Sequence, residues 1–330
     1  MIRFEWLFVV RPTEAIQTIE SRLPELLAQL ALAGDERGLA KAHLVAFERH
    51  NLACRSTLAA EQARLAAEHA RNAGDEDVRA QALGWYITAM LHGPHDAPTI
   101  TKELDRIERE GAGPYLAATI DGARGHLAGL AGHFPEARRS LQTGIEKLRA
   151  IGLHAKVAIA YQYLAPIELR AGEPARALAA LLKADASLAE VAERGGRSTV
   201  QAYLAQVYER LGDSDAARAA AELAEELGGE EDVTNFVITH ATRARIALAD
   251  GDGAAAERWA RSALQHASRT DDTVEQGNAE LELARVLTAH GRREEATPHA
   301  HAALELYEAK GDRPGADSAR AILDELKHRI

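Results

Sequence analysis

Histidine is the side chain best suited to bind a metal ion or carry a proton near neutral pH, and this sequence of 330 residues contains 14 of them. Two groups are close enough in sequence to be tested as metal ligands. The stretch HGPHD covers residues 92–96, and His43, His50 and Cys54 follow one another at intervals of seven and four residues, on one face of a helix. Neither spacing matches a known zinc-binding pattern. We therefore interpret these side chains as loop or helix-packing residues and predict no metal site.

Nucleotide binding and acid–base catalysis are not predicted either. The sequence lacks a G-x4-G-K-[ST] phosphate loop, and GDGAAA at residues 251–256 has the letters of a dinucleotide motif without the strand that must precede it. Paired acids such as Glu225–Glu226 and Glu294–Glu295 fall at turns or helix ends, where they favour solubility and interact with the helix dipole. Because no catalytic grouping is present, we expect a protein that is not an enzyme and needs no cofactor.

The elements that must position any binding residues repeat along the chain. Five phrases of the kind LTAHGRREEA share one glycine, and a small residue lies seven before it, five after it and twelve after it each time. The intervals between these glycines are 40, 40, 39 and 40 residues. The glycines are Gly132, Gly172, Gly212, Gly251 and Gly291. A glycine tolerates the left-handed conformation that ends a helix, and small residues let two antiparallel helices pack closely.

Each repeat is therefore predicted to be a helical hairpin, and the fold an all-α superhelix, or solenoid, of about seven hairpins that resemble tetratricopeptide repeats. We expect one domain over residues 1–330, with a partial repeat at 1–33, seven hairpins within 34–311 and a capping helix at 312–330. The hairpins are expected at 38–73, 76–111, 114–150, 153–193, 196–228, 232–269 and 273–310. The partial repeat contains a turn at Val10–Arg11. An irregular turn is expected at Gly93, because Tyr86 replaces the small residue seven positions earlier.

Composition supports this architecture and excludes several classes of protein. About a fifth of the residues are alanine, which has the highest helix propensity. A formal net charge of −11 without a basic stripe argues against nucleic-acid binding by this region. Cys54 is the single cysteine, so no internal disulfide is possible. With no signal-peptide pattern and no long apolar stretch, we expect a cytoplasmic protein without membrane contact.

The G-x4-A-x6-A spacing resembles the second half of the tetratricopeptide repeat, although these repeats are 40 residues long instead of 34. Repeats of this length are similar to those of MalT-like and LuxR-type ATP-dependent regulators. The segments ARLAAEHARNAGDEDVRAQALGWY and ERGGRSTVQAYLAQVYERLGD also resemble the C-terminal repeats of actinobacterial signalling proteins, which join a cyclase-like or DNA-binding module to an AAA-type ATPase. The resemblance covers nearly the whole chain. It implies an interaction or sensor arm, because the ATPase, cyclase and helix-turn-helix segments are absent from this sequence.

The resemblance also implies which side chains face a concave groove, since positions six and ten before the turn glycine do so in tetratricopeptide proteins. The six-before set is His126, Pro166, Gln206, Arg245 and Arg285. The ten-before set is Gly122, Gln162, Ala202, Ala241 and Leu281, with Tyr163 and Tyr203 alongside. From these sets, the candidate ligand-binding residues are His126, Gln162, Tyr163, Tyr203, Gln206, Arg245 and Arg285.

The two arginines need partners, because burying an unpaired guanidinium is costly. Two kinds of partner are open at this point: an internal acid, Glu280 or Glu282, or an anionic ligand such as a carboxylate or an acidic peptide. The first alternative would make Arg245 and Arg285 structural residues. The second would make them the anion-binding part of the groove.

The preferred hypothesis is a scaffold that binds a protein or an extended peptide, as the interaction or sensor arm of a bacterial signalling or transcription regulator. The expected partner is an ATPase or regulator module, upstream in the chain or in a separate protein. The alternative is a sensor that holds a sugar-like effector inside the superhelix, for which a pocket ringed by Trp85, Tyr86, Tyr163 and Tyr203 would be evidence. A purely structural spacer is a third alternative.

Overall fold

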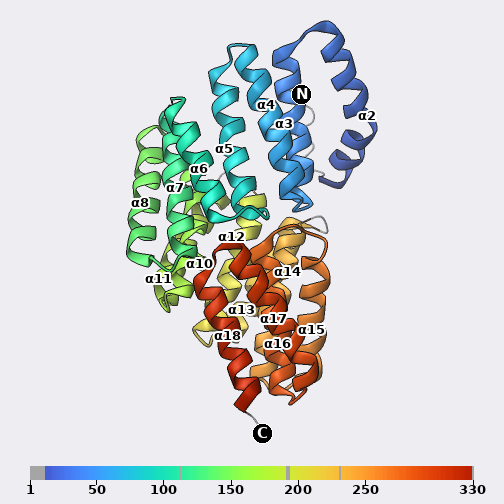
Figure 1. The fold of residues 1–330 in the computed structure, drawn as a ribbon, viewed down its shortest axis with the longest axis vertical. Coiled ribbons are helices and arrows are strands. Elements are labelled where there is room, and N and C mark those ends of the chain that lie inside the picture. Colours follow the sequence, from blue (N-terminus) through green and yellow to red (C-terminus); the bar gives the residue numbers. More distant parts are fainter. Residues whose placement is uncertain (1–11, 112, 191–193, 230–231, 329–330) are drawn as a thin grey trace.

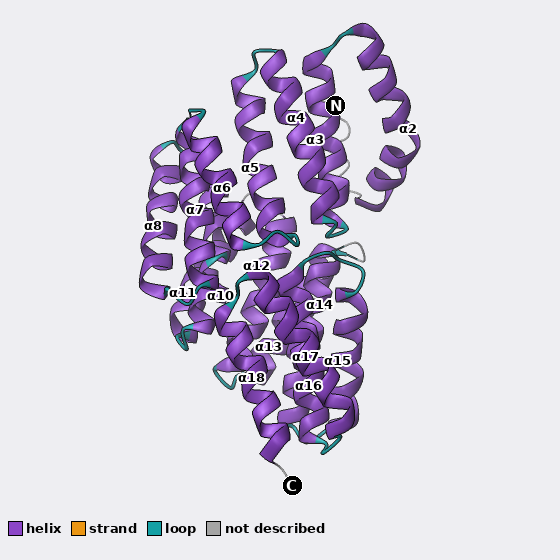
Figure 2. Ribbon diagram, viewed as in Figure 1, coloured by secondary structure: helices purple, strands orange, loops and turns teal. Residues whose placement is uncertain are grey.

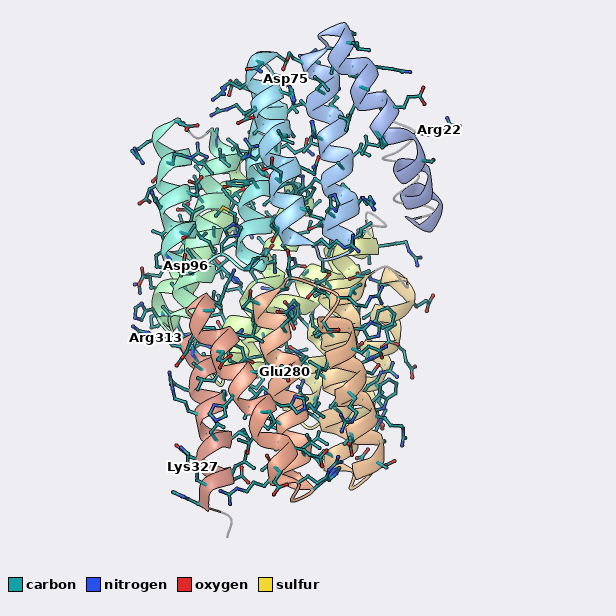
Figure 3. The ribbon with its side chains drawn as sticks, turned by 45° about the vertical axis from the view of Figure 1, so that its right-hand side comes forward. Arg22, Asp75, Asp96, Glu280, Arg313 and Lys327 are labelled. Carbon is teal, nitrogen blue, oxygen red and sulfur yellow. The ribbon has the colours of Figure 1, made fainter. Side chains whose placement is uncertain are left out.

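The computed structural model describes residues 12–328 except 112, 191–193 and 230–231, with side chains from residue 21 onward. Within these residues all regular structure is helical and no strand occurs (Figure 2). Consecutive helices pack as hairpins that stack into a superhelix (Figure 1), which confirms the predicted fold class. The turn expected at Val10–Arg11 lies outside the described residues. Charged side chains such as Arg22 and Lys327 are exposed on the outside (Figure 3).

The helices follow the predicted order of hairpins. A first helix, α2 (Pro12–Ala33), precedes them, and α18 (Arg313–His328) follows them. The first three hairpins are α3 (Glu36–Leu52) with α4 (Ser56–Asn72), α5 (Glu76–His92) with α6 (Ala97–Arg109), and α7 (Pro114–Leu130) with α8 (Phe134–Ala150). In the fourth, α9 (His154–Gln162) and α10 (Leu164–Arg170) together pack on α11 (Pro174–Glu190). The last three are α12 (Arg194–Arg210) with α13 (Ser214–Gly228), α14 (Val233–Ala249) with α15 (Gly253–Ala267), and α16 (Thr273–Ala289) with α17 (Arg293–Lys310).

The small-residue register predicted from the sequence is the packing register of the hairpins. The five turn glycines have φ between 70° and 82°, the left-handed conformation. Every alanine of the register is fully buried, as Ala205 and Ala244 illustrate. A Cβ added to Gly144 would lie 2.7 Å from the carbonyl oxygen of Ala118, so only glycine fits there. Small side chains therefore set the close approach of the paired helices.

The first two hairpins depart from this pattern. Gly93 has an extended backbone, with φ −79°, and begins an irregular loop, as predicted. The loop ends at Asp96, which caps α6. The corresponding position 39 residues earlier is Cys54, which has φ +50°. Among the described residues it is the only non-glycine with a positive φ. A side chain in this conformation is strained and needs support from its surroundings.

The fourth hairpin has a break that the sequence interpretation did not include. Its first helix ends at Gln162 and restarts at Leu164, so Tyr163 lies between α9 and α10. Pro166 accounts for the break, because proline has no N–H to bond the carbonyl of Gln162 and its ring clashes with that carbonyl.

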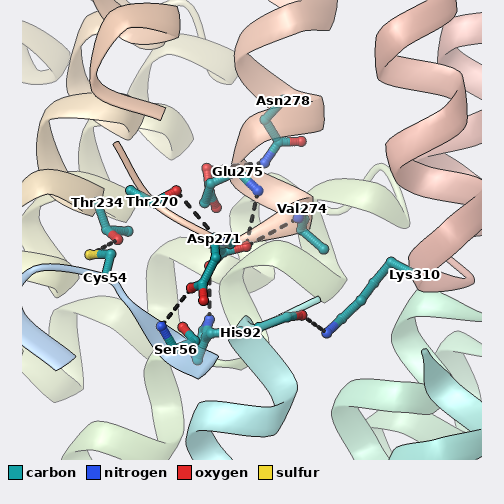
Figure 4. Close-up of polar contacts among 12 residues, drawn as sticks. Cys54, Ser56, His92, Thr234, Thr270, Asp271, Val274, Glu275, Asn278 and Lys310 are labelled. Atoms are coloured by element: carbon teal, nitrogen blue, oxygen red, sulfur yellow. Dashed lines mark hydrogen bonds and ion pairs between the residues drawn. The ribbon is translucent and has the colours of Figure 1, made fainter. Parts of the chain in front are cut away.

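The superhelix closes on itself at a seam, which we define as the contact of residues 53–57 and 90–97 with residues 268–272 and 310–312 (Figure 4). The Asp271 carboxylate accepts the N–H groups of Ser56 at 2.5 Å and Thr57 at 2.8 Å, at the start of α4. The Asp271 N–H in turn donates to the carbonyl of Cys54. The strained turn at Cys54 is thus held by residues more than 200 positions away in the chain.

Two charged contacts complete the seam. Lys310 is fully buried and its Nζ donates to the carbonyl oxygens of Met90 at 3.2 Å and Gly93 at 2.5 Å. Burial lowers the pKa of Lys310 to about 8, because the charged form is less well solvated there. The His92 Nδ1 lies 3.2 Å from the Asp272 carboxylate, which also caps α16. The second hairpin is therefore tied to the last one.

Candidate ligand site

A cavity of about 340 Å³ lies between the first helices of the last four hairpins, and α18 closes one side of it. Its walls come from α10, α12, α14 and α16, which present equivalent faces because the repeats stack in register. The polar side chains that line it are Arg170, Tyr203, Gln206, Arg210, Arg245, Glu275, Asn278, Glu282, Arg285, Tyr307 and Ser318. A cavity of this size is within the range of ligand-binding pockets.

The structure brings together part of the predicted set of site residues. Tyr203, Gln206, Arg245 and Arg285 all line this cavity. The remaining members of the six-before and ten-before sets that line it are Pro166, Ala241 and Leu281. The repeat offset carried over from the tetratricopeptide resemblance thus identifies one wall of a real cavity.

Arg245 has the internal partners that the sequence left open. Its Nε donates to Glu209 at 2.9 Å, and its Nη1 donates to Glu282 at 2.9 Å. A third bond reaches the hydroxyl of Thr242. Glu280, by contrast, bonds His299 of α17 at 2.6 Å and makes no contact with either arginine. The guanidinium of Arg245 is therefore held between two carboxylates, and its role in the cavity is first of all structural.

Arg285 differs, because it makes no ion pair or hydrogen bond with any side chain among the described residues. The side chains of Gln206 and Tyr203 likewise have no hydrogen-bond partner in the described part of the chain. Arg210 reaches only Glu209, at 3.5 Å, which already accepts from Arg245. Burial, and then the charges of Arg245 and Arg285, lower the pKa of Arg210. This corner of the cavity therefore has an excess of positive charge.

The opposite side of the cavity contains two buried acids, Glu275 and Glu282. Glu275 is buried, and burial together with the charge of Asp272 raises its pKa to about 7. Its Oε2 accepts from Asn278, whose Oδ1 accepts from the Tyr307 hydroxyl at 2.8 Å. Glu282 is 3 % exposed, and its Oε1 has no hydrogen-bond partner. A buried carboxylate oxygen without a donor is costly, so a donor from a bound molecule would be favourable there.

His126, Gln162 and Tyr163 lie elsewhere, on the inner face of the first half of the array. The rings of His92, His126 and Tyr163 are 6.1–6.3 Å apart, and burial lowers the pKa of His126 well below its ordinary value. The His126 Nδ1 and the Gln162 Oε1 have no hydrogen-bond partner. These three residues do not line the larger cavity, so the predicted set divides into two groups.

The aromatic ring expected for an effector pocket is not formed. Trp85 and Tyr163 line a second, smaller cavity of about 100 Å³, together with Lys156. Tyr86 packs in the hydrophobic core and Tyr203 belongs to the larger cavity. Trp85 and Tyr86 are consecutive on α5 and therefore point in different directions, and Tyr163 and Tyr203 come from two other hairpins. In the described part of the chain, no group of three His, Cys, Asp or Glu residues is arranged to hold a metal ion.

Sequence reasoning missed the arginines two positions before the turn glycine. Arg170 and Arg210 occupy this position in successive repeats, and both line the cavity. Arg170 is paired with the buried Asp312 at 2.6 Å, so it ties α10 to the start of α18. The recurrence of arginine at this repeat position could have indicated that these side chains share one face of the array. Asn278 and Glu275 had no comparable pattern, because they come from one helix only.

Comparison with known proteins supports the fold and leaves the ligand open. No family model and no curated protein matches the sequence. Among solved structures, NprR in complex with its cognate peptide NprX is similar, with a TM-score of 0.59 and 16% identity over 86% of this chain and 83% of that chain. The apo form of the quorum sensor NprR from B. thuringiensis has a TM-score of 0.48, with 16% identity over 80% of this chain and 79% of that one. Yeast Tom70 has a TM-score of 0.45, with 14% identity over 96% of this chain and 61% of that one.

The chain thus has a tetratricopeptide-like helical-repeat fold. At this level of identity the likeness to NprR is one of fold, so the binding properties must be argued from the cavity itself. A search of the described helices finds none that is long and apolar enough to span a bilayer.

Proposed function

We propose that the protein is a non-catalytic scaffold that binds a peptide or an extended segment of a partner protein in the cavity of its C-terminal half. The observation that carries this proposal is the set of polar groups on the cavity wall that are not used by the protein, above all Arg285, Gln206 and Tyr203. Helical superhelices present such walls to extended peptides. The similar fold of NprR, whose structure contains its cognate peptide, supports the same use of the inner face.

We also propose a cellular setting for this scaffold. The whole array of residues 1–330 acts as one interaction or sensor arm of a bacterial cytoplasmic regulator, and an ATPase or regulator module is its partner. Nucleic acid is not its ligand, because the net charge of −11 repels a polyanion. The resemblance of the repeats to those of ATP-dependent regulators supports this setting.

A peptide-display selection against the full chain tests the binding function. Peptides that bind the wild type should lose binding to Ser318→Trp, because a tryptophan on α18 would occupy the cavity that Ser318 lines. The matched control is Ser187→Trp on α11. The Ser187 side chain is exposed, and α11 contributes no residue to the cavity wall. If selected peptides bind both variants like the wild type, the cavity is not the binding site.

The alternative of a small-molecule sensor is supported by one observation, the cavity volume of about 340 Å³. Native mass spectrometry of protein purified from a bacterial cytosol distinguishes the two functions. A co-purified small molecule that is lost in Ser318→Trp would favour the sensor. A co-purified peptide lost in the same variant would favour the scaffold.

A further inference from the structure

Two histidines lie together directly behind the seam. The Nδ1 of His92 is 3.2 Å from the Asp272 carboxylate, and the His92 ring is 6.2 Å from the ring of His126 on α7. The His126 ring also packs edge-on against Tyr163 at 6.1 Å. The Nδ1 of His126 is buried and has no hydrogen-bond partner among the described residues. His126 is therefore packed as a neutral imidazole, because its cation would be buried without an acceptor.

The charges that face His126 oppose its protonation. Burial is the main reason why the pKa of His126 lies well below its ordinary value of 6.5. His92, Lys310 and Arg170 lower this pKa further, because each of them is positively charged or can become so. Lys310 reaches this place from α17, on the far side of the seam. The closed seam therefore brings a positive charge close to His126.

The acids of the same region are bound to other groups, and none bonds His126 in the described part of the chain. They are Asp96, which caps α6, Asp271, which caps α4, Asp272, which pairs with His92, Glu275, which accepts from Asn278, and Asp312, which pairs with Arg170. A proton on His92 is accommodated by Asp272. A proton on His126 has no carboxylate to pair with while the seam is closed.

We propose that the seam is a proton-sensitive latch, which opens when His126 takes up a proton. Opening hydrates the imidazole and moves Lys310 away from it, so the open form binds a proton that the closed form excludes. Because the pKa of His126 is lowered in the closed form, the closed form is most stable above pH 6.5 and loses stability as the pH falls below this value. The inference concerns the closure of the superhelix and does not depend on the ligand proposed above.

Two neighbouring groups titrate in the same range. His95, in the loop after α5, acts in the same direction, since burial and then the charge of Lys310 lower its pKa. Glu275 acts in the opposite direction, because its pKa of about 7 is raised. Its surroundings belong to α16 and to the cavity wall, so its titration is largely unchanged when the seam opens. The balance therefore favours opening in acid.

The single cysteine of the full chain reports the state of the seam (Figure 4). The Cys54 carbonyl oxygen accepts from the Asp271 N–H, and its Sγ lies 2.8 Å from the Thr234 hydroxyl of α14. Burial raises the pKa of the Cys54 thiol to about 12, so this thiol should react slowly while the seam is closed. The test measures the rate at which dithiodipyridine, a disulfide that reacts with thiols in acid as well as at neutral pH, labels Cys54 between about pH 8 and about pH 5. The reference for the pH dependence of the reagent is Ser187→Cys in a Cys54→Ser background, where the new thiol is exposed on α11.

Relative to this reference, labelling of Cys54 should become roughly 30-fold faster between about pH 7.5 and about pH 5. This is the increase expected when the open form binds one proton with a pKa of 6.5 and the closed form binds none. His126→Gln cannot take up the proton and should reduce the increase to less than about threefold. The control is His133→Gln, which removes an exposed histidine that faces only Glu136 at the end of the same helix, and it should keep the full increase.

Circular dichroism at each pH separates opening of the seam from unfolding of the chain. Faster labelling with a constant helical signal, present in the wild type and lost in His126→Gln, supports the latch. The latch is refuted if the wild type shows no increase, if the increase persists in His126→Gln, or if it coincides with loss of the helical signal. Should His126→Gln fail to fold, His126→Phe provides the same comparison, because it keeps a ring against Tyr163 and cannot be protonated.

Discussion

Arg245 and Arg285 occupy the same position in successive repeats, yet only Arg245 is neutralised by internal acids. The difference comes from the residue three positions before the turn glycine of the preceding repeat. This residue is Glu209 in the repeat before Arg245, and it is Leu248 in the repeat before Arg285. The sequence register could place both arginines on one wall, but their pairing depends on which neighbours the stacked helices bring close. The missing acid leaves Arg285 without an internal counter-charge among the described residues.

The buried Glu275 should make stability depend on pH. Its pKa in the folded chain, about 7, is above the ordinary value of 4.5, so the native state holds this proton more tightly than the unfolded state does. Its contribution to stability is therefore fully present below the unfolded pKa and is lost as the pH rises through 7. Glu275→Gln should raise the free energy of unfolding at about pH 8, by on the order of 2 kcal/mol.

Chemical denaturation at several pH values checks this expectation. The stabilities of Glu275→Gln and the wild type should converge as the pH falls toward 5. The same exchange at the exposed Glu305 of α17 is the control. A Glu275→Gln variant that is less stable than the wild type at alkaline pH would show that the carboxylate is ionised and favourably bound.

The hairpins are the scale at which the sequence was most informative. A repeat of small residues around a glycine predicted the helix pairs, their packing face and the left-handed turns, because these depend on contacts within about 40 residues. The break at Tyr163 was not predicted, although Pro166 was recognised as a groove residue. Its missing N–H is a local property that the repeat pattern does not reveal.

Two glycine substitutions separate the backbone contribution of a turn from that of a helix. A Cβ has open space at both Gly212, in a turn, and Gly122, within α7. Gly212 has φ +82°, so Gly212→Ala should destabilise the protein by about 1–2 kcal/mol through backbone strain alone. Gly122→Ala should stabilise it by about 0.5–1 kcal/mol, because alanine is the better helix former. Urea unfolding curves of the two variants measure both effects, and equal changes in the midpoint would contradict this assignment.

At the scale of the whole molecule, the seam joins segments that no periodic pattern relates. Ser56 and Asp271 are 215 residues apart, and their contact depends on the summed curvature of all the hairpins between them. In the sequence, the seam showed only two local irregularities, Cys54 in place of a turn glycine and the loop that begins at Gly93, and neither indicates a distant contact. This explains why the hairpins could be predicted and the closure could not. It also explains why the predicted site residues were divided between two regions of the inner face.

Asp271→Ala should open the seam, because it removes both acceptors for the N–H groups at the start of α4. We expect faster amide exchange at Ser56 and Thr57 and a larger radius in small-angle X-ray scattering. Asp250→Ala, which removes an exposed ion pair with Arg218, should change neither. An unchanged exchange rate in Asp271→Ala would mean that the remaining contacts of Lys310 and His92 suffice for closure.

A chain that is joined to itself in this way differs from an open array in its response to a cut. In an open stack of repeats, each unit contacts only its neighbours, so one break separates the molecule into two pieces. Here a single cleavage at the exposed turn of Gly212 would leave the two fragments connected by the seam as well as by the packing of α12 on α13. The two fragments should therefore reassociate after separation and behave as complementing halves.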